Sequence, residues 1–342
     1  MTDPGEQREL DQLEGVPPPE ASERLIGHAE VEAQLAAQIT AGRLGTGILL
    51  HGPRGIGKAT LAFHVIANLI AATGDEPIDR VRAQIAAGAH PNVFVLRIPF
   101  EDGRFRTEIR VGNVRQLIEK LHLTRGRAGH IAVVIDAAED CNQSAANALL
   151  KSLEEPPANT HFFLISHQPG RLLPTVRSRC QSYAMRALGP DEMASFAASH
   201  GGEGETAEFE LAAGNPRRLC ELQALGDTAL IEEVRAWLAH PLNAADARTL
   251  SIARSLADRQ NAASEAFVRR LILDWIASEA RNAASSGAET NRLASADALW
   301  EKATRSFTET DIFNLDLAAT YLTLLDAISA HERRGTGQLI AQ

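Results

Sequence analysis

A short glycine-rich segment that ends in a lysine has the clearest chemistry in the sequence. It reads Gly52-Pro53-Arg54-Gly55-Ile56-Gly57-Lys58, directly after a predicted strand and before a predicted helix. In that context a Gly-x-x-x-x-Gly-Lys pattern binds phosphate, because backbone N–H groups at a helix start can surround the anion and the lysine can reach its outer oxygens. A glycine-rich turn with an incidental lysine is the alternative, and the flanking elements disfavour it. We therefore predict a phosphate loop whose binding residues are Gly52, Gly55, Gly57 and Lys58.

The loop lacks the hydroxyl that normally holds magnesium. Ala59 occupies the position where such loops carry Ser or Thr. Thr60 comes next, but one residue turns a helix by about 100°, so we expect its hydroxyl to face the inner phosphates or the core. A metal-assisted reaction would therefore lack one of its ligands.

A second departure lies at the end of the apolar run Ile131–Asp136. A hydrolysing site has Asp-Glu here, the Asp for the metal shell and the Glu to activate water. In this chain Ala137 follows Asp136. Glu139 and Asp140 lie beyond, and we expect them to cap the following turn rather than to replace the base. Because each loss removes roughly several kcal/mol of transition-state stabilisation, we predict negligible hydrolysis and only weak binding of ATP or ADP.

The elements that must position these residues follow from the pattern of apolar runs. Residues 47–51, 93–98, 131–136 and 161–166 have the length and composition of buried parallel strands. Amphipathic stretches at 58–70, 113–123 and 144–154 predict crossover helices between them. After residue 186 helical periodicity takes over. We predict an α/β fold followed by an all-α part: a flexible segment 1–20, a P-loop α/β domain 21–186, a helical lid 187–240 and a helical collar domain 241–342.

The composition excludes several classes of protein. A net charge of −10 argues against a protein that coats nucleic acid by bulk electrostatics. The three cysteines lie about forty residues apart and fit neither a disulfide framework nor paired zinc ligands. The chain begins without an apolar signal region, and no run approaches the roughly 20 apolar residues of a membrane span. We expect a cytoplasmic protein without a membrane partner.

Three further segments resemble one protein family. Residues 145–157, Ala-Ala-Asn-Ala-Leu-Leu-Lys-Ser-Leu-Glu-Glu-Pro-Pro, are similar to the helix after the Walker B strand in bacterial clamp-loader subunits, which are AAA+ proteins. Ser178-Arg179-Cys180 resembles the Ser-Arg-Cys element of that family, and Gly214-Asn215-Pro216-Arg217-Arg218 resembles its sensor-2 segment. Residues 24–28 are similar to the adenine-side entry, and Ser166 ends a strand at the sensor-1 position. The resemblance spans about residues 24–220.

The resemblance implies roles for two arginines. Arg179 would be an arginine finger that reaches the ATP of a neighbouring subunit, where a guanidinium can neutralise charge on the γ-phosphate and raise the rate by roughly 10³ to 10⁵. Its alternative is a plain ion pair with a local carboxylate. Arg217 would be the sensor-2 arginine beside the nucleotide, whereas a helix–helix corner is the alternative for its segment.

Among clamp-loader subunits, the delta-prime class is the one expected to lack the hydrolysis ligands and to keep the finger. The resemblance implies a largely non-hydrolysing scaffold of the DNA polymerase III holoenzyme that helps to load the sliding clamp on primed DNA, with gamma/tau and delta subunits as partners. It would be a component of a DNA-directed DNA polymerase, a nucleotidyltransferase, without polymerase or ATPase activity of its own. Many relatives carry a four-cysteine zinc module, but residues 73–92 contain no cysteine, so we expect no zinc.

Two other functions stay open. A hydrolysing gamma/tau-like ATPase subunit would turn over ATP by itself, and Lys58→Ala would abolish that turnover. A P-loop nucleotide kinase would phosphorylate a nucleoside, although the missing magnesium ligand and the Ser-Arg-Cys segment argue against it. A local basic face for DNA is a further hypothesis, with solvated loop arginines as its alternative. The arginines concerned are Arg104, Arg106, Arg110, Arg125 and Arg127.

Overall fold

The computed structural model describes residues 12–13, 16–73, 76–101, 103–123, 129–200, 206–242, 246–285 and 290–335. Its internal contacts divide the chain into two compact units, Met1–Glu221 and Leu222–Gln342. The boundary lies inside the range predicted for the lid, so the three-domain division stays a prediction. Arg125 and Arg127 lie outside the described residues.

A five-stranded parallel sheet forms the centre of the first unit. Its strand order is β2-β5-β6-β1-β7, and the pairings that join these strands are parallel. The strands are β1 (Gly47–His51), β2 (Val93–Leu96), β5 (Ile131–Asp136), β6 (Thr160–Ser166) and β7 (Gln181–Ala184). The predicted α/β class is confirmed, but β7 was missed. Only Tyr183 of β7 is buried, so this edge strand has no apolar run to reveal it.

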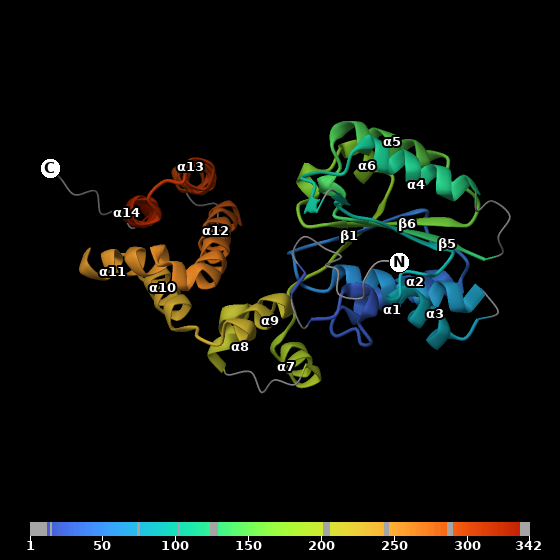
Figure 1. Ribbon diagram of the computed structural model, residues 1–342, viewed down its shortest axis with the longest axis horizontal. Coiled ribbons are helices and arrows are strands. Elements are labelled where there is room, and N and C mark those ends of the chain that lie inside the picture. Colours follow the sequence, from blue (N-terminus) through green and yellow to red (C-terminus); the bar gives the residue numbers. More distant parts are fainter. Residues whose placement is uncertain are drawn as a thin grey trace. The chain divides into compact units, whose positions relative to one another are not determined.

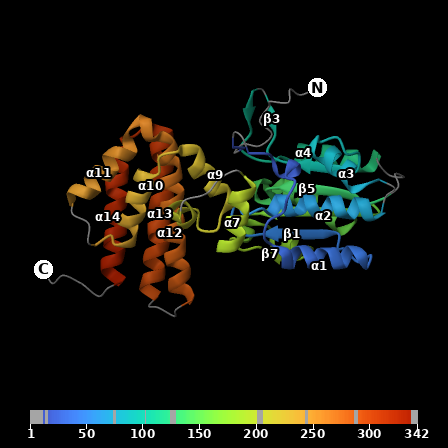
Figure 2. The same cartoon turned by 90° about the horizontal axis from the view of Figure 1, so that it is seen from below.

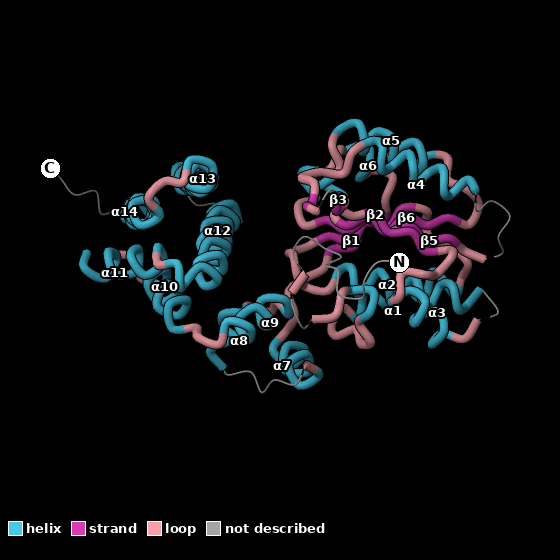
Figure 3. Tube along the Cα trace, in the orientation of Figure 1, coloured by secondary structure: helices cyan, strands magenta, loops and turns pink. Residues whose placement is uncertain are grey.

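Helices cover both faces of the sheet (Figures 1 and 3). One layer is α1 (Ala29–Thr40), α2 (Lys58–Thr73) and α3 (Ile78–Ala86), and the other is α4 (Val111–Leu123), α5 (Gln143–Glu154) and α6 (Pro174–Arg177). Alternate residues of each strand enter the two cores: Ile48 and Leu50 pack with α1 to α3, and Leu49 packs with α4 to α6. Because both faces are buried, the strands read as continuous apolar runs.

The carboxyl ends of three neighbouring strands bring the site together. In the parallel register His51 of β1 lies opposite Ser166 of β6, and Asp136 of β5 lies opposite Ile165. The phosphate loop follows β1, and the segments after β5 and β6 form the short helices η2 (Ala138–Asp140) and η3 (Pro169–Arg171). Ligands of open α/β sheets bind at this edge. Two further strands, β3 (Phe100–Glu101) and β4 (Arg104–Phe105), form an antiparallel hairpin.

The rest of the described chain is helical. After η1 (Pro19–Ala21) at the start, the remaining elements are α7 (Pro190–Ser199), α8 (Thr206–Ala212), α9 (Pro216–Leu225), α10 (Ala229–Ala239), α11 (Asp246–Ala257), η4 (Arg259–Asn261), α12 (Ala262–Ser285), α13 (Thr290–Phe313) and α14 (Leu317–Gly335). In the second unit α13 packs between α12 and α14 (Figure 2). Its core includes Trp237 and Tyr321, both almost fully buried. The described helices include none that is long and apolar enough to cross a bilayer.

Candidate functional site

The phosphate loop needs its glycines. Gly52, Gly55 and Gly57 have φ values of 151°, 82° and 100°, which L-residues rarely adopt. A Cβ added at Gly52 would lie 2.2 Å from the carbonyl oxygen of Met185, and one at Gly55 would lie 2.6 Å from Cβ of Arg217. The glycines therefore let the loop pack closely against neighbouring backbone and helix α9.

Lys58 is buried, and its ammonium group is hydrogen-bonded to its own loop. It is 3% exposed, and its Nζ donates hydrogen bonds to the carbonyl oxygens of Gly52 at 2.8 Å and Pro53 at 2.5 Å. Burial lowers the pKa of Lys58 to about 8, and the nearby Asp136 carboxylate opposes this shift. A phosphate that binds here must replace the two carbonyl contacts.

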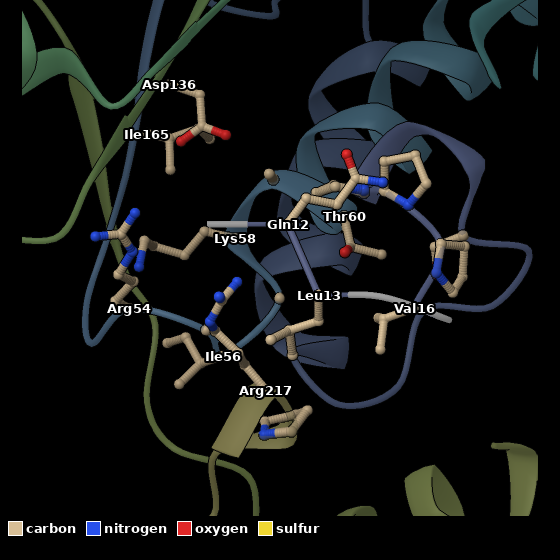
Figure 4. Close-up of a pocket in the computed structure, with 18 of the residues that line it drawn as sticks. Gln12, Leu13, Val16, Arg54, Ile56, Lys58, Thr60, Asp136, Ile165 and Arg217 are labelled. Atoms are coloured by element: carbon tan, nitrogen blue, oxygen red, sulfur yellow. The ribbon is translucent and has the colours of Figure 1, made fainter. Parts of the chain in front are cut away.

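The sheet edge brings most of the predicted binding residues into one pocket of about 270 Å³ (Figure 4). Those lining it are Gly55, Gly57, Lys58, Thr60, Asp136 and Arg217. Gly52 lies at the base of the loop, where its N–H donates to the carbonyl of Ser166 at 3.3 Å. The side chain of Ser166 is fully buried and outside the pocket lining, and its hydroxyl has no hydrogen-bond partner among the described residues.

The N-terminal residues that precede the sheet also line this pocket. Gln12, Leu13 and Val16 are among its lining residues (Figure 4). The sequence assigned these residues only to a flexible lead-in. Gln12, Leu13 and Val16 therefore help to shape the space beside the phosphate loop.

The remaining Walker B carboxylate has a basic neighbour. Oδ2 of Asp136 lies 3.9 Å from Nε of Arg97. The two terminal nitrogens of Arg97 also donate to the carboxylate of Glu20, at 3.0 and 2.9 Å. Asp136 thus belongs to a charge network that reaches the first helical turn of the chain.

The two acidic residues after β5 have different roles. Oδ2 of Asp140 accepts a hydrogen bond from the N–H of Ala137 at 3.4 Å, so it caps the following turn as expected. Glu139 does not: its Oε1 accepts from the N–H groups of His167 at 2.7 Å and Gln168 at 3.0 Å, and therefore holds the segment after β6. A carboxylate fixed in this way is poorly placed to act as a general base.

His167 and Arg54 are site residues that the sequence reasoning missed. Both line the pocket. Burial, together with the positive charges of Lys58, Arg54 and Arg217, lowers the pKa of His167 to about 3. The sequence could have indicated both residues, because His167 directly follows Ser166 at the sensor-1 position and Arg54 lies inside the Gly-x-x-x-x-Gly-Lys motif.

The sensor-2 segment contacts the phosphate loop through its backbone and an asparagine. Nδ2 of Asn215 donates to the carbonyl of Arg54 at 2.7 Å, and the N–H of Arg217 donates to the carbonyl of Gly55 at 3.3 Å. The side chain of Arg217 forms an ion pair with Glu221, one turn along α9, at 3.0 Å. Arg217 therefore borders the pocket, and its predicted action on a nucleotide stays a prediction.

Arg179 lies apart from this pocket, in an exposed segment next to α6. Its Nη2 is 2.5 Å from Oε1 of Glu154 at the end of α5, and its Nη1 donates to the carbonyl of Thr175 at 3.1 Å. The Arg179 and Glu154 side chains are 38% and 42% exposed, so the ion pair stabilises the fold by at most about 1 kcal/mol. The local pair considered from the sequence is present, and it is weak enough for another anion to replace the carboxylate.

The arginines considered for a DNA-binding face are partly engaged with acidic neighbours. Arg106 pairs with Glu101 at 2.9 Å, and Arg110 pairs with Glu108 at 3.1 Å. These pairs neutralise part of the charge that a basic face for DNA would offer.

The sequence has relatives of known identity. Residues 27–189 match the family model described as DNA polymerase III, delta subunit. The chain is 46% identical over 140 residues to the DNA polymerase III subunit delta' of Pseudomonas aeruginosa, covering 40% of this chain and 42% of the relative. It is 36% identical over 152 residues to subunit delta' of Escherichia coli, covering 43% and 44%.

More distant similarity extends to other subunits. The chain is 28% identical over 180 residues to the DNA polymerase III subunit tau of Salmonella typhimurium, covering 51% of this chain and 27% of the relative. A solved gamma subunit-related protein of Thermotoga maritima aligns with a TM-score of 0.44 at 17% identity, covering 88% of this chain and all of that one.

The residues that match the family model all lie in the first unit. The chain spans less than half the length of the delta' relatives it matches, 42% and 44% for the two described. The matched residues contain the phosphate loop, the Walker B strand and the segment of Arg179. Residues 27–189 thus match a DNA polymerase III delta-subunit family model, and the chain is similar to delta-prime subunits over 140 and 152 residues.

Proposed function

We propose that this chain is the delta-prime subunit of a clamp loader, a AAA+ scaffold that hydrolyses little or no ATP and supplies Arg179 to a neighbouring ATPase subunit. Its partners would be gamma/tau and delta subunits, and the assembled loader would place the sliding clamp on primed DNA. The relatives are DNA polymerase III subunits, which supports this assignment. A cytoplasmic location follows from the proposed role.

One observation carries the proposal: among the described residues, the contacts of the exposed Arg179 guanidinium are exchangeable ones. They are an exposed carboxylate and one carbonyl oxygen. A γ-phosphate carries more negative charge than the Glu154 carboxylate and can accept two N–H donors of one guanidinium at once. The ATP bound to a neighbouring subunit could thus replace Glu154 as the partner of Arg179.

The chain's own loop supports the same division of labour. Ala59 and Ala137 remove a metal ligand and the catalytic base, and Glu139 is bound to backbone N–H groups. Weak binding of ATP or ADP remains compatible with the loop and Lys58, because these contacts need neither missing side chain. A hydrolysing subunit of the gamma/tau kind is less well supported for this reason.

The test is clamp- and primer-stimulated ATP hydrolysis by a loader rebuilt with this chain. We expect Arg179→Ala to lower the rate by roughly 10³-fold, the worth of an arginine finger, while gel filtration shows an intact assembly. Arg177→Ala is the matched control, since this arginine is exposed in the same segment, and it should leave the rate nearly unchanged. Equal rates for wild type and Arg179→Ala would refute the finger.

ATP turnover by the isolated chain distinguishes a hydrolysing gamma/tau-like subunit from a non-hydrolysing scaffold. Hydrolysis that Lys58→Ala abolishes would show a working ATPase subunit in place of a scaffold. We expect no turnover above background in either protein.

A further inference from the structure

Basic side chains dominate the pocket at the sheet edge. Among the described residues that line it, five are Arg or Lys and two are Asp. The basic ones are Arg24, Arg54, Lys58, Arg97 and Arg217, and the acidic ones are Asp136 and Asp140. Such a pocket attracts anions.

The oxygens that could hold a divalent cation are few or already engaged. Magnesium prefers carboxylate, hydroxyl and phosphate oxygens in octahedral geometry. Ala59 offers no hydroxyl, Asp140 accepts a hydrogen bond from the N–H of Ala137, and Asp136 lies 3.9 Å from the guanidinium of Arg97. A metal ion entering with a phosphate would keep the Asp136 carboxylate as a ligand, but it would find no hydroxyl at position 59 and a guanidinium beside that carboxylate.

A group of cations converges where the outer phosphates would lie. Arg54, Lys58 and Arg217 line the pocket together with His167, and their positive charges contribute to the low pKa of its ring. Nδ1 of His167 is buried and has no hydrogen-bond partner among the described residues. Figure 4 shows Arg54 and Lys58 together on one side of the pocket, facing Asp136. An anion here would reduce the mutual repulsion of the cations and could provide the partner that Nδ1 lacks.

We propose that this pocket binds a pyrophosphate-type group without magnesium, with Arg54 and Lys58 as its charged ligands and His167 as an added hydrogen-bonding group. The arginine and lysine supply the positive charge that a magnesium ion contributes in a hydrolysing P-loop. A magnesium-complexed phosphate has less negative charge to offer and brings a further cation into the group, so it binds more weakly. The proposal rests on the phosphate loop of the proposed function and is independent of Arg179.

Binding requires one local exchange. The ammonium of Lys58 leaves the carbonyl oxygens of Gly52 and Pro53 and donates to phosphate oxygens instead. An ammonium is attracted more strongly by a negatively charged phosphate oxygen than by a neutral carbonyl oxygen, which favours this exchange. The pyrophosphate group could belong to a nucleotide or be a free anion. A nucleotide also needs space for its base in the part of the pocket that Gln12 and Leu13 line, and this requirement distinguishes the two sources.

The experiment is isothermal titration calorimetry on the full isolated chain in a phosphate-free buffer. Sodium pyrophosphate and ADP are titrated separately, once with excess EDTA and once with excess magnesium chloride. We expect a measurable Kd in EDTA for at least one of the two, and a Kd several-fold higher in magnesium. Binding of ADP alone identifies a nucleotide as the source, and binding of pyrophosphate alone identifies the free anion.

Three variants sharpen the result. Arg54→Gln should raise the Kd in EDTA by about tenfold or more, the effect of losing one charged hydrogen bond. Arg43→Gln removes the same charge from an exposed position outside the pocket and should leave the Kd unchanged. Ala59→Thr restores the hydroxyl that holds magnesium, so magnesium should weaken binding less or even strengthen it.

Binding that requires magnesium in the unmodified chain would overturn the proposal, and so would the absence of binding for both anions in both conditions. These measurements do not involve a neighbouring subunit. The Arg179→Ala protein should bind like wild type, so a failure of the metal-free site and a failure of the finger give different patterns.

Discussion

Two cationic sites in the first unit, the phosphate loop and the exposed segment of Arg179, differ in how their charges are satisfied. Lys58 is 3% exposed and is bound by two carbonyl oxygens of its own loop. Arg179 is 38% exposed at its side chain and is paired with an exposed carboxylate. A buried cation must find partners within its own chain, whereas an exposed one can exchange them for those of another molecule. This difference is what the proposed role of Arg179 toward a neighbouring subunit requires.

The largest expected effect tests the exposed site. In the rebuilt loader, Arg179→Lys should lower stimulated ATP hydrolysis by roughly 10³-fold, because lysine keeps the charge but loses the planar fork that contacts two oxygens at once. Steady-state turnover at equal assembly measures this. A rate close to that of wild type would mean that charge alone suffices and that the two-pronged contact is not used.

The next effect tests how deeply Lys58 is buried. Its pKa of about 8 lies below the reference value of 10.5, so between these pH values the unfolded chain binds more protons and stability rises with pH. The free-energy cost of burying the charged Lys58 ammonium is fully present below pH about 8. Relative to Lys58→Met, wild type should gain up to about 3 kcal/mol in its free energy of unfolding between pH 8 and 10.5. Urea unfolding at several pH values tests this, with Arg179→Met as control.

Parallel stability curves for wild type and Lys58→Met would show that the ammonium is solvated. Lys58 and Arg179 would then differ only in which groups they contact and no longer in how far their charges are shielded from water.

Glycine substitutions compare how tightly the two sites are packed. Gly52→Ala places a Cβ 2.2 Å from the backbone carbonyl oxygen of Met185 at a φ of 151°, and we expect it to lower the free energy of unfolding by about 2–3 kcal/mol. Gly170→Ala, near the Arg179 segment, meets no atom within 4 Å and should change it by less than about 0.5 kcal/mol. Urea unfolding of both variants gives the comparison, and equal losses would contradict it.

The smallest effect concerns the partner of Arg179. Glu154→Gln should change the free energy of unfolding by less than about 1 kcal/mol, because the pair is exposed to solvent. Glu155→Gln in the same segment is the matched control. A loss of several kcal/mol for Glu154→Gln alone would mean that the pair is structural and that Arg179 is not free to change partners.

Most of the sheet could be predicted, and the exceptions have physical causes. Strands β1, β5 and β6 are buried on both faces, and their apolar runs define them within one residue. Strand β7 was not predicted because Tyr183 is its only buried residue. Its position is set by pairing with β1, which a local pattern does not contain.

The sequence by itself determined which chemical groups are present: the loop glycines and Lys58, the alanines at positions 59 and 137, and the arginine of the Ser-Arg-Cys segment. The tertiary structure decided what these groups contact. It tied Glu139 to the segment after β6, placed His167 beside three cations and paired Arg179 with Glu154. These contacts join residues up to about 160 positions apart, as in the hydrogen bond from Asn215 to Arg54. Hydrophobic periodicity reports which face of an element is buried, whereas the partner of a polar group depends on how separate elements pack.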